Sequence, residues 1–327
     1  MNNKIRKLSI FIDKTLGELL FTIFNLFNYK KNNFYIDKND IKNILMIRPG
    51  GVGDFLLTIP SFKKLRKIFP KANMTLLLFK RNYECIELYN KFDKVILIDK
   101  PLEFFRFLFN KSRYDLAIDF DQYRKIASIL TLLSDSKIKI GFDNNGKGVS
   151  YDYPIKYSKD TYEAISFLSL LSPLTKTDSL KEIDLLLIKN YKDYYRKNKY
   201  KNVGIYASAM KEENRLPIKK WENIIDFMGK SKNYYFFGYK NDKYRYDKLE
   251  QNFNGYNIIR NDGKLSLKES LNTLSKMDLL ISEDGGVFHM GVCVGIPTTS
   301  YWLHGESNMN KWKAPFKKHK GILIKHE

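Results

Sequence analysis

Apolar residues recur at helical spacing near the start of the chain. The stripe comprises Leu8, Ile12, Leu16, Leu19, Leu20, Ile23 and Phe27. A period of 3.6 residues predicts an amphipathic helix within an N-terminal segment that we place at residues 1–40. Asp13, Lys14 and Glu18 interrupt the apolar run, so it is a poor transmembrane span, and no small-residue cleavage site follows that would mark a signal peptide.

Two interpretations of this helix stay open. Cations flank it on both sides, at Lys4, Arg6, Lys7, Lys30 and Lys31. An interfacial helix would place such cations against the anionic headgroups of a membrane. An ordinary helix that packs on the first domain would show the same apolar stripe.

From residue 41 the pattern changes to short apolar runs separated by turns and helical stretches. Residues 43–48 predict a buried strand, residues 49–54 a glycine turn, and the residues from 55 onward a helix. Further apolar runs at 74–79, 95–98 and 116–120 fit a mostly parallel sheet. This succession predicts a Rossmann-like domain over residues 41–185.

A charged stretch then leads into a second domain of the same kind, which we place at residues 186–327. Its predicted units are strands at 202–206, 234–237, 277–282 and 297–302, with helices at 221–228 and 287–294. One domain of 327 residues would be unusually large, so two domains are expected on length alone. The predicted fold class is therefore α/β, with two Rossmann-like domains behind an N-terminal amphipathic helix.

Composition and charge narrow the class of protein. Hydrophobic residues make up 43% of the chain, which supplies enough apolar surface for packed sheets. The net charge of +21 favours an anionic environment: nucleic acid, a membrane surface or a phosphorylated substrate. The basic residues are dispersed and no nucleic-acid motif occurs, so we expect no nucleic acid partner.

Cysteine and histidine usage predicts no disulfide and no metal site. Cys85 and Cys293 lie in separate halves of the chain. The four histidines, His289, His304, His319 and His326, lack metal-ligand spacing. A reducing, cytoplasmic location fits this pattern.

The turn after the first strand is the first candidate for chemistry, because ligands of doubly wound sheets bind at the carboxyl ends of the strands. Arg48 follows the strand, Gly51 and Gly53 let a substrate approach the backbone, and Asp54 begins the helix. Asp54 is either a helix cap or a general base that accepts a proton from an attacking hydroxyl. The spacing lacks the third glycine of the dinucleotide fingerprint, so a nicotinamide site is not favoured.

The second candidate is the turn that contains Asp284, Gly285, Gly286 and His289. Backbone amides and the positive end of a helix can hold a diphosphate at such a turn. Taken singly, Asp284 is readily explained as a helix cap and His289 as a buried helix residue. Their combination beside two glycines favours a donor site.

A third candidate is the loop after the strand at 202–206. Ser208, Lys211 and Arg215 could grip phosphate oxygens there. A solvated charged loop before a proline-initiated helix explains the same residues equally well.

Taken in order, these segments resemble glycosyltransferase family nine, the bacterial heptosyltransferases that build the inner core of lipopolysaccharide. The resemblance spans residues 43 to about 320, and its most specific parts are ILMIRPGGVGDFLLTIP at 44–60 and DLLISEDGGVFHM at 278–290. Weaker matches are YDLAIDFDQ at 114–122 and KIGF at 139–142.

The resemblance implies a GT-B fold, in which two Rossmann-like domains face a cleft, and an inverting sugar transfer without a metal or other cofactor. Asp54 would be the general base. Arg48, Gly51 and Gly53 would line the acceptor side, and the donor side would contain Ser208, Lys211, Arg215, Asp284, Gly285, Gly286 and His289. The implied donor is a nucleotide sugar, ADP-heptose, and the implied acceptor is a phosphorylated glycolipid at the anionic cytoplasmic face of the inner membrane.

The sequence departs from the family pattern in the donor half. The loop Asn214-Arg215-Leu216-Pro217 lacks the lysine usual there, and relatives often continue beyond the end of this chain into a further helix. Two alternatives therefore stay open beside the heptosyltransferase. One is a transferase that uses another nucleotide sugar for capsule or other surface glycans, and the other is an inactive homologue that binds glycolipid.

Overall fold

The computed structural model describes residue 22 and residues 36–109, 114–176, 179–187, 200–209, 212–303 and 305–324. The amphipathic helix predicted within residues 8–27 lies outside this part of the chain except for Thr22. Among the described helices, none has both the length and the hydropathy to cross a membrane.

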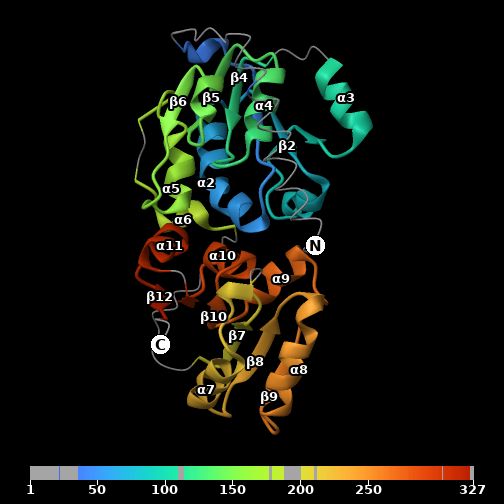
Figure 1. The fold of residues 1–327 in the computed structure, drawn as a ribbon, viewed down its shortest axis with the longest axis vertical. Coiled ribbons are helices and arrows are strands. Elements are labelled where there is room, and N and C mark those ends of the chain that lie inside the picture. The colour runs from blue at the N-terminus through green and yellow to red at the C-terminus, as the bar shows by residue number, and fades with distance from the viewer. Residues whose placement is uncertain are drawn as a thin grey trace.

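The first half of the chain forms a six-stranded parallel sheet with the order β3-β2-β1-β4-β5-β6 (Figure 1). Its strands are β1 (Asn43–Ile47), β2 (Asn73–Leu78), β3 (Lys94–Leu97), β4 (Leu116–Asp119), β5 (Ile138–Asp143) and β6 (Tyr153–Lys156). The accompanying helices are η1 (Lys38–Asp40), α2 (Val52–Ile68), η2 (Lys80–Glu87), α3 (Pro101–Phe109), α4 (Lys125–Leu133), η3 (Lys147–Ser150), α5 (Glu163–Ser169) and α6 (Glu182–Leu185).

The second half forms another six-stranded parallel sheet, with the order β12-β11-β10-β7-β8-β9. Its strands are β7 (Asn202–Tyr206), β8 (Asn233–Phe237), β9 (Asn257–Arg260), β10 (Leu279–Glu283), β11 (Thr298–Trp302) and β12 (His319–Leu323). Its helices are η4 (Glu212–Asn214), α7 (Ile218–Met228), η5 (Lys240–Asp242), α8 (Lys243–Gln251), α9 (Leu267–Leu274), α10 (Gly286–Cys293) and α11 (Gly305–Trp312).

Both sheets have the strand order 3-2-1-4-5-6 of a Rossmann domain. The direction of winding reverses between β1 and β4 in the first sheet and between β7 and β10 in the second. The prediction of an α/β protein with two Rossmann-like domains of GT-B type is confirmed. The boundary after residue 185 stays a prediction.

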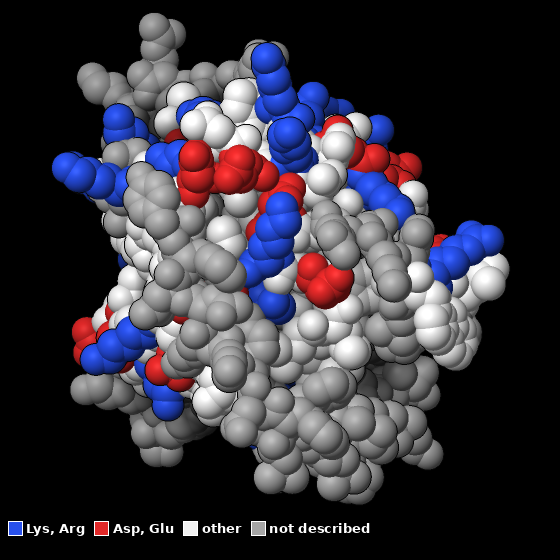
Figure 2. Space-filling view, turned by 90° about the horizontal axis from the view of Figure 1, so that it is seen from above, with Lys and Arg blue, Asp and Glu red and all other residues white. Residues whose placement is uncertain are grey.

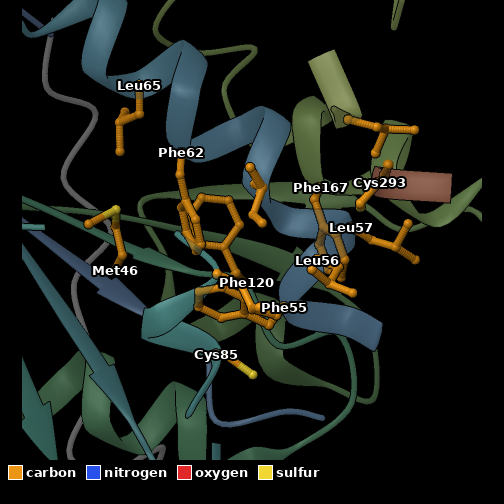
Figure 3. Packing of buried hydrophobic residues seen from close by; sticks show 14 of the residues in the cluster. Met46, Phe55, Leu56, Leu57, Phe62, Leu65, Cys85, Phe120, Phe167 and Cys293 are labelled. Carbon is orange, nitrogen blue, oxygen red and sulfur yellow. The ribbon is translucent and has the colours of Figure 1, made fainter. Parts of the chain in front are cut away.

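The helix α2 owes its position to its sequence. Phe55, Phe62 and Leu65 are buried, and Phe62 packs edge-on against Phe120 at a ring distance of 5.4 Å. Figure 3 shows these rings between α2 and the sheet, with Cys293 of the second half in the same cluster. The core is therefore continuous across the two halves, and its packing fixes the first turn of α2 relative to α10.

Both cysteines are part of this interior. Cys85 and Cys293 are buried and free.

On the end of the molecule seen in Figure 2, Lys and Arg side chains are interspersed with Asp and Glu.

Candidate active site

The two glycine turns singled out in the sequence face each other across the junction of the two halves. The first turns of α2 and α10 are in contact (Figure 1). A Cβ atom at Gly53 would lie 2.7 Å from Cδ2 of His289, and one at Gly286 would lie 3.7 Å from the side chain of Val52. Two helix N-termini, each with free amide groups and a partial positive charge, therefore meet at one place.

Asp54 is the third residue of α2, and three groups surround its carboxylate. The Gly51 amide donates to Oδ2 at 3.2 Å, Nη2 of Arg48 lies 3.0 Å from Oδ1, and the Gln122 amide donates to Oδ1 at 3.4 Å. A quarter of the side chain, 25%, is exposed. Asp54 thus caps its helix and also presents an oriented carboxylate at the surface, so the two interpretations of the sequence are compatible.

Arg48 is buried and links Asp54 to the end of β4. Its Nη1 lies 3.5 Å from Oδ2 of Asp121, and its guanidinium lies 5.0 Å from the ring centroid of Phe167. Burial opposes ionisation of Asp121, yet Arg48 and Lys147 outweigh it and hold the pKa of Asp121 below its usual range. The guanidinium is therefore fixed before any substrate binds.

Beneath Arg48 lies a second buried ion pair, which the sequence pattern did not predict. Nζ of Lys147 is 2.9 Å from Oδ2 of Asp119, which also accepts a hydrogen bond from the Tyr151 hydroxyl at 2.5 Å. Burial raises the pKa of Asp119. Lys147 enters the site from η3, far from β4 in the sequence, so only the register of the sheet brings these charges together.

In the second half, Glu283 holds the loop that follows β7. It is fully buried at the end of β10, and its carboxylate accepts hydrogen bonds from the amides of Ala209 and Leu216 at 2.7 and 2.8 Å. Trp221 and Arg245 also donate to it, at 2.9 and 3.1 Å. Burial raises its pKa despite these partners.

Ser208 and Arg215, two of the predicted phosphate contacts, converge on Asp242. The Ser208 hydroxyl, fully buried, donates to Oδ2 of Asp242, and Nη2 of Arg215 lies 2.8 Å from its Oδ1. Lys211 lies outside the described residues. The sequence reasoning missed Asp242, whose only local signal is a position shortly after the second strand of the domain.

His289 is buried at the junction, at the end of the first turn of α10. Burial lowers its pKa to about 4, although Asp54 acts in the opposite direction, so the imidazole is neutral near pH 7. Its Nδ1 has no hydrogen-bond partner among the described residues. His289 is thus not tied to a backbone carbonyl through this atom.

Asp284 and Gly285 stand at the start of α10. Asp284 is half-buried, and Gly285 is the cap residue of the helix. A Cβ atom at Gly285 would lie 2.8 Å from the hydroxyl of Tyr206. A side chain at position 285 would therefore displace Tyr206 at the end of β7.

This arrangement can take a proton and can hold an anion. Among the described residues, no three His, Cys, Asp or Glu side chains cluster as metal ligands. Asp54 offers the carboxylate, and the N-terminus of α10 offers a partial positive charge, whereas the Arg215 guanidinium in the loop after β7 is paired with Asp242.

Comparison with known families gives a match over most of the chain. The family model described as glycosyltransferase family 9 (heptosyltransferase) matches residues 103–327. A search of curated proteins finds no significant match.

Comparison with solved structures shows the same fold at low sequence identity. A family 9 glycosyl transferase from Veillonella parvula DSM 2008 superposes with a TM-score of 0.70 at 19% identity, covering 90% of this chain and 88% of that one. The E. coli heptosyltransferase WaaC with ADP-2-deoxy-2-fluoro heptose gives 0.66 at 15% identity, covering 86% and 92%. The E. coli ADP-heptose lps heptosyltransferase II gives 0.64 at 13% identity, covering 86% and 90%.

Proposed function

The chain belongs to glycosyltransferase family 9, and from this membership we propose that it transfers heptose, or a related sugar, from an ADP-sugar to a phosphorylated glycolipid of the lipopolysaccharide core. The reaction inverts the anomeric carbon and uses no metal. WaaC, similar in fold, was solved with an ADP-heptose analogue, which supports an ADP-linked donor.

The observation that carries this proposal is the meeting of Asp54 with the first turn of α10. The Asp54 side chain is partly exposed, and the opposite side of the junction offers the N-terminus of α10, which begins at Gly286 after the cap residue Gly285. A base on one side and an anion-binding helix end on the other are what an inverting displacement requires, since attack and departure occur on opposite faces of the sugar.

In the proposed step, Asp54 takes the proton of the acceptor hydroxyl as its oxygen bonds to the anomeric carbon. The bond from that carbon to the donor diphosphate breaks, and the nucleoside diphosphate leaves with the electron pair. Arg48 and Gln122 hold the carboxylate in place, and Arg215 with the α10 amides stabilises the charge that develops on the leaving group.

The exposed face of α3 supports the proposal that the acceptor is bound to a membrane. This face has Leu102, Phe105 and Phe109 at helical spacing, with 64%, 54% and 77% of each residue accessible. Arg106 lies on the same helix and is exposed. Apolar side chains beside a cation suit an anionic lipid surface, so we propose that α3 contributes to peripheral attachment.

The nucleotide preference tests the donor assignment. We expect ADP and ADP-heptose, but not UDP or GDP, to raise the melting temperature of the purified protein in chelator, because a ligand of the folded state stabilises it. A shift with UDP or GDP would redirect the donor to another nucleotide sugar. No shift at saturating concentration would favour the inactive homologue.

Sedimentation with vesicles tests the membrane contact. Replacing Leu102, Phe105 and Phe109 by Ser should reduce binding to vesicles rich in phosphatidylglycerol. The control is Phe227→Ser, which removes a side chain that is 90% exposed on the second half. Equal binding of both variants would contradict a role for α3 and leave residues 1–40 as the candidate anchor.

A further inference from the structure

Lys311, near the end of α11, reaches from the second half of the molecule into the first. Only 8% of its side chain is exposed. Its ammonium lies 3.7 Å from Oε2 of Glu163 and donates a hydrogen bond to the hydroxyl of Tyr123. A buried lysine without an anionic partner is costly, so these contacts define where α11 can sit.

Tyr123, Tyr157 and Glu163 form a preassembled receptor for this ammonium, which we call the lysine socket. The Tyr157 hydroxyl donates to Oε2 of Glu163 at 2.9 Å and lies 3.1 Å from the Tyr123 hydroxyl. The ammonium is 5.0 and 4.6 Å from the ring centroids of Tyr123 and Tyr157. The socket thus combines an ion pair, a hydrogen bond and two cation–π contacts.

The socket is continuous with the groups that orient Asp54. Tyr123 directly follows Gln122, whose amide donates to Asp54, and the Tyr123 amide donates to Asp121 at 2.9 Å. Glu163 starts α5, the helix that packs on α2 and places Phe167 beneath Arg48. Movement of the socket would therefore move the partners of the catalytic carboxylate.

The residue after Lys311 contacts the donor half of the junction. Trp312 follows Lys311, and its ring centroid lies 6.1 Å from that of His289. His289 in turn packs against Gly53, one residue before Asp54. Lys311 and Trp312 are thus adjacent residues that touch the two sides of one site.

We propose that Lys311 is a positioning residue for sugar transfer: by seating in the Tyr123–Tyr157–Glu163 socket, it holds the donor half against the loop that orients Asp54. This inference rests on the proposed function. Lys311 acts through the socket, without contact to the sugar, and it defines the arrangement of the two halves in which the base and the leaving-group site face each other.

The ion pair in the socket is sensitive to pH. Burial raises the pKa of Glu163 to about 7, Lys311, Tyr157 and Arg48 oppose this rise, and Asp54 adds to it. Above this pKa the carboxylate attracts Lys311, and below it only the tyrosine contacts remain. Turnover should therefore fall as the pH drops through about 7.

The main test replaces Lys311 by Met and compares it with Lys317→Met, which removes an exposed cation of the same half. We expect Lys311→Met to lower kcat by about 10- to 100-fold, because misplacement of reacting groups is costly. The donor KM should change by less than about twofold, since Lys311 is not a donor contact. Glu163→Gln should remove the acid limb of the pH profile of kcat. The double variant Lys311→Met with Tyr123→Phe should lower kcat by no more than the larger of the two single changes.

A distance measurement makes the test independent of activity. Spin labels at Lys71→Cys and Lys219→Cys, two exposed positions on opposite halves, can be attached selectively because the native cysteines are buried. Lys311→Met should broaden the distance distribution between them, and Lys317→Met should leave it unchanged.

Each outcome decides one question. An unchanged distance and an unchanged kcat in Lys311→Met would overturn the inference, as would a Glu163→Gln variant with the wild-type acid limb. If the wild-type protein transfers no sugar, the proposed function fails, whereas the distance distributions still decide whether Lys311 joins the two halves.

Discussion

Gly53 shows at the residue scale how tightly the two halves meet. A methyl group at this position would lie 2.7 Å from the His289 ring, but one at Gly51 would meet, among the described residues, only Asp54, at 3.7 Å. Both glycines have ordinary backbone angles for any residue, because Gly51 is extended and Gly53 is helical. The two positions therefore form a matched pair for substitution.

We expect Gly53→Ala to destabilise the protein by about 1–3 kcal/mol through overpacking and to reduce turnover, because the first turns of α2 and α10 must move apart. Gly51→Ala should leave the stability close to that of the wild type. Urea unfolding and steady-state kinetics on the two variants provide the check. Equal stability of the two variants would mean that the junction is looser than the structure indicates.

At the residue scale, the sequence predicted the positions of the functional loops better than it predicted the contacts that their side chains make. The spacing of Gly51, Gly53 and Asp54 marked a turn before a helix, and that turn lies at the junction. Nothing local marked Glu163 or Lys311, because their contacts join residues 148 positions apart in the chain (311 − 163). For Ser208 the sequence predicted a contact with phosphate, but its hydroxyl is buried and donates to Asp242.

At the scale of the elements, one carboxylate connects β10 to the loop after β7. Replacing Glu283 by Ala would leave the amides of Ala209 and Leu216 without their acceptor, and the Arg245 guanidinium would lose its carboxylate partner. Removing one partner of a buried charge pair costs about 3–5 kcal/mol, so we expect a large loss of stability and of nucleotide binding.

The control for this change is Glu250→Ala, since Glu250 pairs with Arg260 at the surface with 46% of its side chain exposed. An exposed ion pair contributes about 0–1 kcal/mol, so this variant should unfold almost as the wild type does. Chemical denaturation separates the two. A Glu283→Ala protein as stable as Glu250→Ala would show that the loop has other support.

Strands with a strong apolar run were predictable from the sequence, including the edge strand β3 at 95–98, and strands with a weaker run were not. The pattern predicted strands at 43–48 and 277–282, and the structure has β1 and β10 there, because central strands of a parallel sheet are buried on both faces. The prediction omitted β5 and β6 in the first sheet and β9 and β12 in the second. In the edge strands β9 and β12, exposed positions break the apolar run.

At the scale of the whole molecule, two buried groups at the junction make the stability of the folded protein depend on pH in opposite directions. The pKa of Glu163 is raised to about 7, so its contribution to stability is present below its unfolded value of 4.5 and is lost as the pH rises through 7. The pKa of His289 is lowered to about 4, so its contribution is present above 6.5 and is lost as the pH falls through 4.

Between about pH 4.5 and 6.5 the contribution of Glu163 to the free energy of unfolding falls with pH, and that of His289 rises. In Glu163→Gln only His289 titrates, so we expect the free energy of unfolding to rise with pH in this window. In His289→Phe only Glu163 titrates, so the free energy of unfolding should fall. Unfolding free energies from urea titrations at several pH values test this. Parallel curves for the two variants would show that neither group titrates as described.

The two-domain arrangement was predictable because each half contains a strand, a glycine turn and a helix in succession, at β1 and α2 in the first half and at β10 and α10 in the second. What the sequence could not predict is how closely the halves approach, since that depends on contacts such as Lys311 with Glu163 and His289 with Gly53. Such contacts join residues far apart in the sequence, so no local pattern encodes them.

The most direct test of the central claim is sugar transfer from ADP-heptose to a lipopolysaccharide acceptor that lacks heptose, with the wild type, Asp54→Asn and the exposed control Asp40→Asn compared in chelator. Asparagine retains an oxygen that can cap α2 but cannot take a proton. We predict that Asp54→Asn loses about 10²- to 10⁴-fold in kcat with nearly unchanged donor binding, and that Asp40→Asn matches the wild type. Wild-type turnover in Asp54→Asn would contradict the account.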